Sequence, residues 1–93
     1  MENQENTALK VDAKLALDLV AVAETLPRGS FVKIAEVCNC SDEYVRRFFK
    51  GEYFITEENI KILDAANKIL DKELAIEEKA KKKVTEILNK ARG

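Results

Sequence analysis

Apolar residues recur at helical spacing through most of the chain, and the first such stretch runs from Thr7 to Leu26. Successive apolar positions there are three or four residues apart, which predicts an amphipathic helix of about five turns that Pro27 ends. The stripe consists of Val11, Leu15, Leu19, Val22 and Leu26. We expect this helix to pack on the rest of the core, and a separate partner-binding helix is the alternative.

Two shorter helices are predicted next, separated by a break in the pattern at Asn39. The first covers residues 31–37 and has Ser30 in front of it as the expected N-cap. Asn enters the left-handed backbone region at low cost, so we expect a tight turn over residues 38–40. Ser41 then caps the second helix, and Gly51 is placed to close it at the C′ position.

The second of these helices has two chemically different faces. At 100° per residue, Val45, Phe48 and Phe49 share one face, which we expect to anchor the helix in the core. The opposite face is charged and is expected to point outward. It carries Asp42, Glu43, Arg46, Arg47 and Lys50, with Tyr44 on its flank.

A last helix is predicted from Thr56, its expected cap, to Arg92, because no Gly or Pro interrupts that stretch. Ile55 and Ile60 are placed as a hydrophobic staple at its start. Its core face is expected to hold Ile60, Leu63, Ala66, Ile69 or Leu70, and Leu74. A helix of about 36 residues would be about 54 Å long, which exceeds what so small a domain can cover. It must therefore break near residues 72–78 and fold back, or project and pair with another chain.

Composition narrows the possible functions. The 93 residues make one domain with a modest core, and the net charge of −1 gives no overall attraction to nucleic acid. Positive charge is local: residues 28–50 hold 5 basic and 3 acidic groups, and residues 79–93 hold 6 and 1. Any binding to nucleic acid must therefore come from a local patch.

The sequence contains none of the usual residue patterns of an enzyme active site. The chain has no His, no nucleophile paired with a base, and no Gly-rich phosphate loop, so we expect neither catalysis nor a cofactor or small-molecule substrate. Cys38 and Cys40 are too few for a structural zinc site, and we expect them to be reduced and packed in the core. No signal-peptide core or membrane span is visible, which favours a soluble, cytoplasmic protein.

The stretch from Ser30 to Leu70 resembles a known family. Its pattern of small, turn, cap and apolar positions is similar, without a gap, to the DNA-binding headpiece of the lactose-repressor type, within the phage-repressor-like helix-turn-helix class. The matching positions are Ile34-Ala35-Glu36, the turn, Ser41, Val45, Arg47, Ile55-Thr56-Glu57 and Ile62-Leu63-Asp64-Ala65-Ala66. Asn39 stands where the family usually has Gly, and two acids begin the second helix where it usually has neutral residues.

The resemblance implies an all-α fold, a phage-repressor-like helix-turn-helix bundle with a long C-terminal helix. Residues 1–70 would form the DNA-binding domain, and residues 71–93 a helical extension that is a dimerisation segment or a basic tail. The implied function is that of a sequence-specific, repressor-like transcriptional regulator, bacterial or phage-encoded, that binds double-stranded DNA as a homodimer. Its two half-sites would lie about one helical turn apart, and the long helices would form the dimer contact.

The second helix, Ser41 to Lys50, is the expected recognition helix in the major groove. Arg46 and Arg47 are suited to guanine O6 and N7, and Asp42 or Glu43 to the amino group of cytosine. The predicted phosphate contacts are Ser30, from the resemblance, and Arg28, Tyr44 and Lys50, from the helical wheel.

Two other functions stay open. The same fold serves as a protein-interaction adaptor in some proteins, and the acids at the start of the second helix favour that alternative. The third possibility is a non-specific DNA-binding accessory protein of a phage or mobile element, which would use the basic cluster formed by Lys79, Lys81, Lys82 and Lys83.

Overall fold

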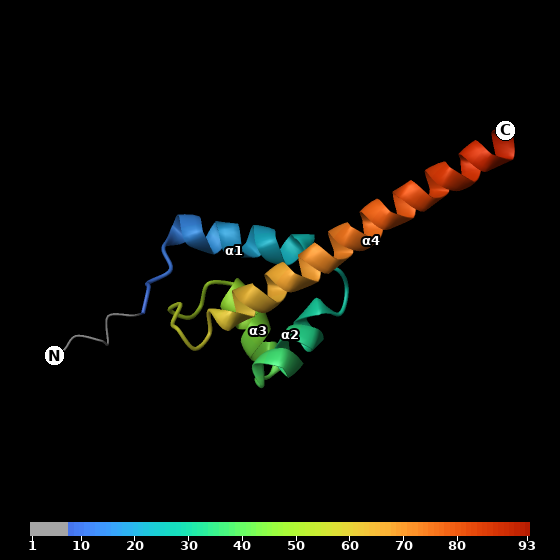
Figure 1. Ribbon diagram of the computed structural model, residues 1–93. Coiled ribbons are helices and arrows are strands. Elements are labelled where there is room, and N and C mark those ends of the chain that lie inside the picture. The colour runs from blue at the N-terminus through green and yellow to red at the C-terminus, as the bar shows by residue number, and fades with distance from the viewer. Residues whose placement is uncertain (1–7) are drawn as a thin grey trace.

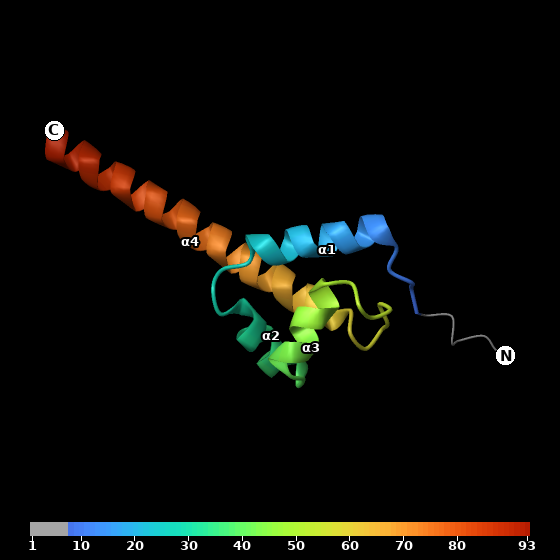
Figure 2. The same cartoon turned by 180° about the vertical axis from the view of Figure 1, so that it is seen from behind.

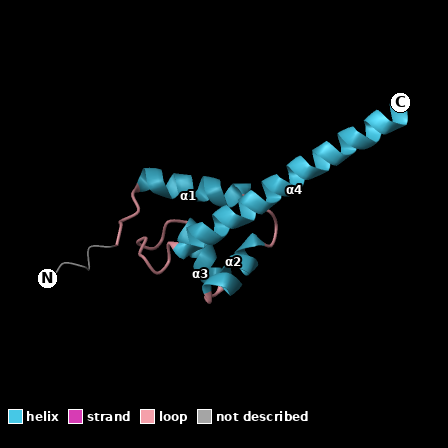
Figure 3. Ribbon diagram, viewed as in Figure 1, coloured by secondary structure: helices cyan, strands magenta, loops and turns pink. Residues whose placement is uncertain are grey.

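The computed structural model describes residues 8–93, and this part of the chain folds into helices connected by turns and loops (Figures 1 and 3). The helices are α1 (Ala13–Thr25), α2 (Ser30–Cys38), α3 (Asp42–Phe49) and α4 (Lys61–Arg92). The β-pairing found in the described residues is one isolated antiparallel bridge between Leu9 and Ile55. The predicted all-α class is confirmed, and its narrower assignment to the phage-repressor-like class stays a prediction.

Helix α1 begins later than its apolar stripe predicted. Asp12 is its N-cap, and the carboxylate accepts a hydrogen bond from the Leu15 amide at 2.8 Å. The predicted start at Thr7 lies outside the described residues, and residues 8–12 are not helical, because Leu9 exchanges two backbone hydrogen bonds with Ile55, of 2.8 and 2.9 Å. The packing prediction is confirmed: Leu19 is buried, and α1 lies against α3.

The N-terminal end of α2 differs from the prediction, whereas its C-terminal end agrees with it. Gly29, at φ 85°, is the N-cap, and Ser30 is already the first helical residue, so the predicted cap was wrong by one position. Only glycine adopts such a dihedral without strain. At the other end Asn39 has φ 58°, and the amide of Cys40 bonds to the carbonyl of Ala35 at 2.9 Å, which confirms the predicted left-handed turn.

Helix α4 starts at Lys61, five residues after the predicted cap. Thr56 does cap backbone amides, but it does so over a separate turn at residues 57–60, where Asn59 completes a reciprocal pair of hydrogen bonds. The amide of Ile62 bonds to Asn59 at 3.0 Å, a tight i to i−3 contact at the junction between that turn and the helix. The turn therefore takes the place of the predicted first helical turn.

The buried face of α4 also differs from the prediction. Ile62, Ala65 and Ala66 are buried, whereas Ile60 and Leu74, which were expected in the core, are exposed. The apolar stripe is wide enough to allow either edge to face inward. In the structure, the edge with two alanines packs against α2, because small side chains let two helices approach closely.

Beyond the core, α4 continues without a break as a projecting helix (Figures 1 and 2). Every residue from 71 to 93 is exposed, and the described chain extends over 70 × 27 × 25 Å. Of the two alternatives left by the sequence, the structure therefore has the projecting helix. The largest fully buried side chains lie on α2, α3 and the start of α4; they are Ile34, Val45, Phe48, Phe49 and Ile62.

Candidate nucleic-acid interface

Helix α3 is held in a fixed orientation by its aromatic face. Phe48 and Phe49 are almost fully buried and meet edge to face, with ring centroids 5.4 Å apart. Phe49 also stacks on Phe31 of α2 at 5.6 Å. Such aromatic pairs have preferred geometries, so they fix the angle between the two helices as well as burying apolar area. The predicted anchored face of α3, which includes Val45, is confirmed.

Both ends of α3 are capped. The Ser41 hydroxyl accepts a hydrogen bond from the Tyr44 amide at 3.0 Å, as predicted. At the other end Gly51 has φ 81°; its amide bonds to Phe48, and that of Glu52 bonds to Arg47, at 3.0 and 3.2 Å. This pair of bonds is the Schellman arrangement that a left-handed glycine permits. A helix of only eight residues thereby has defined ends.

The predicted base-reading residues lie together on the exposed side of α3, and Glu43 links the two arginines. Its carboxylate accepts a hydrogen bond from Arg46 Nη1 at 2.6 Å and another from Arg47 Nε at 2.9 Å. Glu52 adds a second acidic group 3.9 Å from Arg47 Nε. The hydrogen bond and charge of Glu43, followed by the charge of Glu52, raise the pKa of Arg47 above its ordinary value. Asp42 is exposed beside this cluster.

Tyr44 connects the flank of α3 to the loop that leads to α4. Its ring stacks on Tyr53 with centroids 4.5 Å apart, and its hydroxyl accepts a hydrogen bond from the Asn59 amide at 3.3 Å. The side chain is therefore half-buried, and its hydroxyl lies against the loop. Lys50, the C-cap of α3, is exposed.

The two other predicted phosphate contacts lie at the start of α2 and differ in accessibility. Arg28 is exposed in the turn before the helix. Ser30 is only 4% exposed, and its hydroxyl donates to the carbonyl of Pro27 at 2.6 Å. Because a buried and already bonded hydroxyl offers little to a phosphate, Ser30 acts here as a structural residue that fixes the turn into α2.

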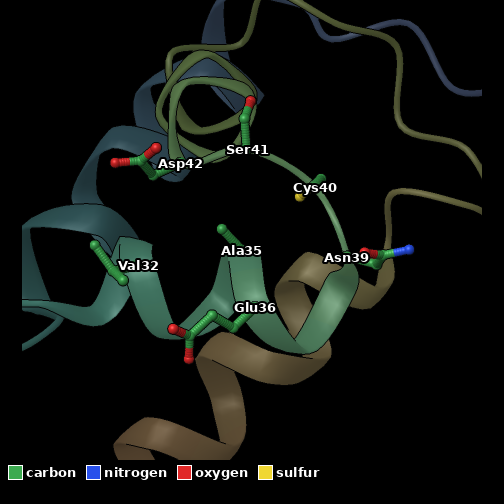
Figure 4. Close-up of a pocket in the computed structure, with 7 residues that line it drawn as sticks. All are labelled: Val32, Ala35, Glu36, Asn39, Cys40, Ser41 and Asp42. Carbon is green, nitrogen blue, oxygen red and sulfur yellow. The ribbon is translucent and has the colours of Figure 1, made fainter.

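An open groove of about 310 Å³ lies between α2 and the start of α3 (Figure 4). Val32 and Ala35 supply part of its wall, and Glu36 and Asp42 carry carboxylates at its edge. The side of α3 that faces this groove is therefore acidic, whereas Arg46, Arg47 and Lys50 lie further along the helix. A phosphate chain that approached α3 would therefore meet carboxylates on the side of the groove and basic groups further along the helix.

Two residues that matter for this surface were not identified from the sequence. Glu52 follows α3 and lies near Arg47 only because Gly51 turns the chain back. Asn59 is buried. Its side-chain oxygen accepts a hydrogen bond from the backbone amide of Thr56 at 2.8 Å, and its side-chain nitrogen donates to the carbonyl of Phe54 at 2.8 Å. The spacing Thr-x-x-Asn resembles a capping box with Asn in place of Glu or Gln, and that signal could have identified Asn59.

The described residues were also searched for side chains that could hold a metal ion or form a disulfide. No group of three metal-ligating side chains forms there, and both cysteines are free thiols. Burial, followed by the charge of Cys40, raises the pKa of the Cys38 thiol. Among the described residues, no helix is both long and apolar enough to cross a membrane.

No protein-family model, curated protein or solved structure matches this chain. The resemblance to the lactose-repressor-type headpiece therefore stays a prediction, and it rests on the residues named above.

Proposed function

We propose that this protein is a sequence-specific DNA-binding regulator of the helix-turn-helix class, with α3 as its recognition helix. The observation that supports this function is the exposed row of Arg46, Arg47 and Lys50 on a short helix whose opposite face is locked in the core. A rigidly held helix with guanidinium groups outward is what major-groove reading requires.

The arginines must exchange partners to read bases. In the free protein both are bonded to Glu43, so binding to guanine would replace one carboxylate with the O6 and N7 acceptors of the base. This exchange favours sites where Glu43 itself gains a partner, and the amino group of cytosine is the base donor that suits it. Glu43 is thus proposed to penalise non-specific binding and to add selectivity.

Phosphate contacts are assigned to Arg28, Lys50 and the flank formed by Tyr44. Arg28 and Lys50 are exposed, and neither lies deep in the core. They would set the register of α3 on the duplex without reading its sequence. Because one small headpiece buries little area on DNA, useful affinity calls for a homodimer.

The test is a selection of binding sites from random duplex DNA with the full chain at two salt concentrations. We expect an enriched palindromic site that the Arg46→Ala/Arg47→Ala variant no longer binds. The control variant is Lys10→Ala/Lys14→Ala, which removes the same charge from residues that precede or begin α1 and keeps the site. No retention of DNA by the unchanged protein at low salt would refute the proposal.

A second candidate function is a protein-interaction adaptor that uses the same face. The observation in its favour is the acidic groove edged by Glu36 and Asp42, next to arginines that are already paired. Such a surface fits a basic peptide better than a phosphate backbone. Failure to retain DNA in the selection, together with binding of a basic peptide that is lost in Glu36→Gln/Asp42→Asn, would establish this function.

A further inference from the structure

An apolar groove of about 770 Å³ lies where α4 leaves the core, between α2 and α4. Val37 of α2 and Ile76 of α4 line it with exposed fractions of 76% and 67%, and Ile34, Ala65 and Ile69 form the rest of its apolar wall. The chain's own C-terminal segment does not cover this groove, because α4 runs straight past it as one continuous helix (Figure 1). Among the described residues, the groove is therefore open to solvent.

The projecting part of α4 carries a second apolar surface. Its members share one side of the helix and are exposed, and successive members are three or four residues apart except for one adjacent pair; they are Ile76, Ala80, Val84, Ile87, Leu88 and Ala91. At 100° per residue this stripe continues the buried face that begins at Ile62. The stripe therefore extends the apolar wall of the groove along α4, with the charged Lys72 and Glu73 between Ile69 and Ile76.

Charge along the projecting helix is divided into two halves. Residues 71–78 hold four acidic groups and one basic group, whereas residues 79–92 hold six basic groups and one acidic group. One ion pair joins the halves within the chain, between Lys81 and Glu77 at 3.1 Å. Two parallel copies would place like charges side by side, whereas two antiparallel copies would place each acidic half beside a basic half. The charge pattern is therefore self-complementary in the antiparallel direction.

We propose that the surface formed by the groove and the α4 stripe binds a second copy of this chain, with the two α4 helices antiparallel. Matching acidic to basic halves places the two-fold axis near residues 78–79. In that register Glu73 lies beside Val84 and Lys83 of the partner subunit. The partner's Ile87, Leu88 and Ala91 then reach the groove. The contact is isologous, as closed dimers require, so each chain both fills a groove and has its own filled.

This dimer is independent of whether the protein binds DNA, but it changes the geometry that DNA binding would have. With the axis near residue 78, the two copies of Ile62 are about 50 Å apart along the helix direction. Half-sites one helical turn apart lie only about 34 Å from centre to centre. The antiparallel dimer therefore places the starts of the two α4 helices further apart than the centres of half-sites one turn apart.

The first experiment measures the association of the full chain by sedimentation equilibrium. We expect a dimer, with its dissociation constant raised more than tenfold in Val84→Asp/Ile87→Asp and in Val37→Asp. The matched control is Thr85→Asp/Asn89→Asp, which adds two charges to the other side of the same exposed helix and leaves the dimer unchanged. These positions are exposed in the single chain, and an unchanged melting of the core in dilute protein shows that folding is intact.

The second experiment tests direction by disulfide formation, on a background of Cys38→Ala/Cys40→Ala. A mixture of Glu73→Cys and Val84→Cys chains should cross-link, whereas Val84→Cys alone should not, because its two copies are separated by about 16 Å along the axis. A monomer at 100 μM protein, or rapid cross-linking of Val84→Cys with itself, would overturn the antiparallel dimer. An unchanged dissociation constant in Val37→Asp would overturn the role of the groove.

Discussion

Replacing Gly51 with Ala tests how α1 closes on the end of α3. Gly51 has φ 81°, and a Cβ built there would lie 2.9 Å from the Cβ of Ala16 and 3.3 Å from Cγ1 of Val11. The substitution therefore carries two separate penalties, a strained backbone dihedral and a collision with α1. Both act at the junction that holds the proposed recognition helix in place.

The size of the effect follows from comparing two glycines. Gly29 has nearly the same φ, 85°, but nothing lies within 4 Å of its hypothetical Cβ. Gly29→Ala should therefore cost only the left-handed strain, about 1–2 kcal/mol. Gly51→Ala adds an overpacking penalty of about 1–3 kcal/mol, for a total of about 2–5 kcal/mol. That is a large fraction of the stability of a domain of this size, roughly 5–14 kcal/mol.

Urea unfolding followed by tyrosine fluorescence is the appropriate assay. Tyr44 and Tyr53 stack on each other and pack against the core, whereas circular dichroism would also report on the exposed half of α4. Adding Ala16→Gly to Gly51→Ala removes the atom that the new methyl group meets, so a double-mutant cycle should show coupling of about 1–3 kcal/mol. Equal costs for the two glycine variants, with no coupling to Ala16, would refute this packing of α1.

Three further predictions concern Asn59, Glu43 and Cys38. Asn59→Ala should lower the free energy of unfolding by about 1–3 kcal/mol, because it removes the hydrogen-bond partner of Thr56 and Tyr44. Its control, Asn67→Ala on the exposed side of α4, should have little effect in the same urea assay. Glu43→Gln should raise the affinity for non-specific DNA roughly threefold to tenfold by releasing the arginines, and an affinity no higher than that of Glu58→Gln would argue against a restraining role. Because the pKa of Cys38 is raised by burial, folding favours its protonated thiol. Stability from this group is thus present below about pH 9 and declines above it, and Cys38→Ala should weaken that decline in urea titrations across pH 8–10.5.

Several features of the structure could be predicted because they depend on neighbours in sequence. The turn at Asn39, the Ser41 cap, the left-handed Gly51 and the division of α3 into a buried and an exposed face all rest on local sterics or 3.6-residue periodicity. Two of the places where the prediction was wrong involve competition between two acceptable choices. Ser30 and Gly29 could each begin α2, and two edges of the α4 stripe could each face inward.

The charged residues of α3 also include contacts that the sequence predicts and contacts that it does not. Periodicity alone placed Glu43, Arg46 and Arg47 on one exposed face, because residues three and four apart on a helix are neighbours. The sequence could not show that Glu52 returns to Arg47, or that Asn59 ties the following loop to Tyr44, because both contacts depend on where the chain goes after Gly51.

The sequence by itself determined the helical class, the short paired helices and their outward charges, since these follow from spacing and from the residues that cap and turn the backbone. Only the tertiary structure decided that α4 projects and does not fold back, and that α2 and α4 leave an apolar groove beside the point where it emerges. The physical reason is that burial is shared among elements far apart in sequence. A wide apolar stripe shows that a helix has something to bury, but only the packed core shows which edge is buried and which edge stays exposed.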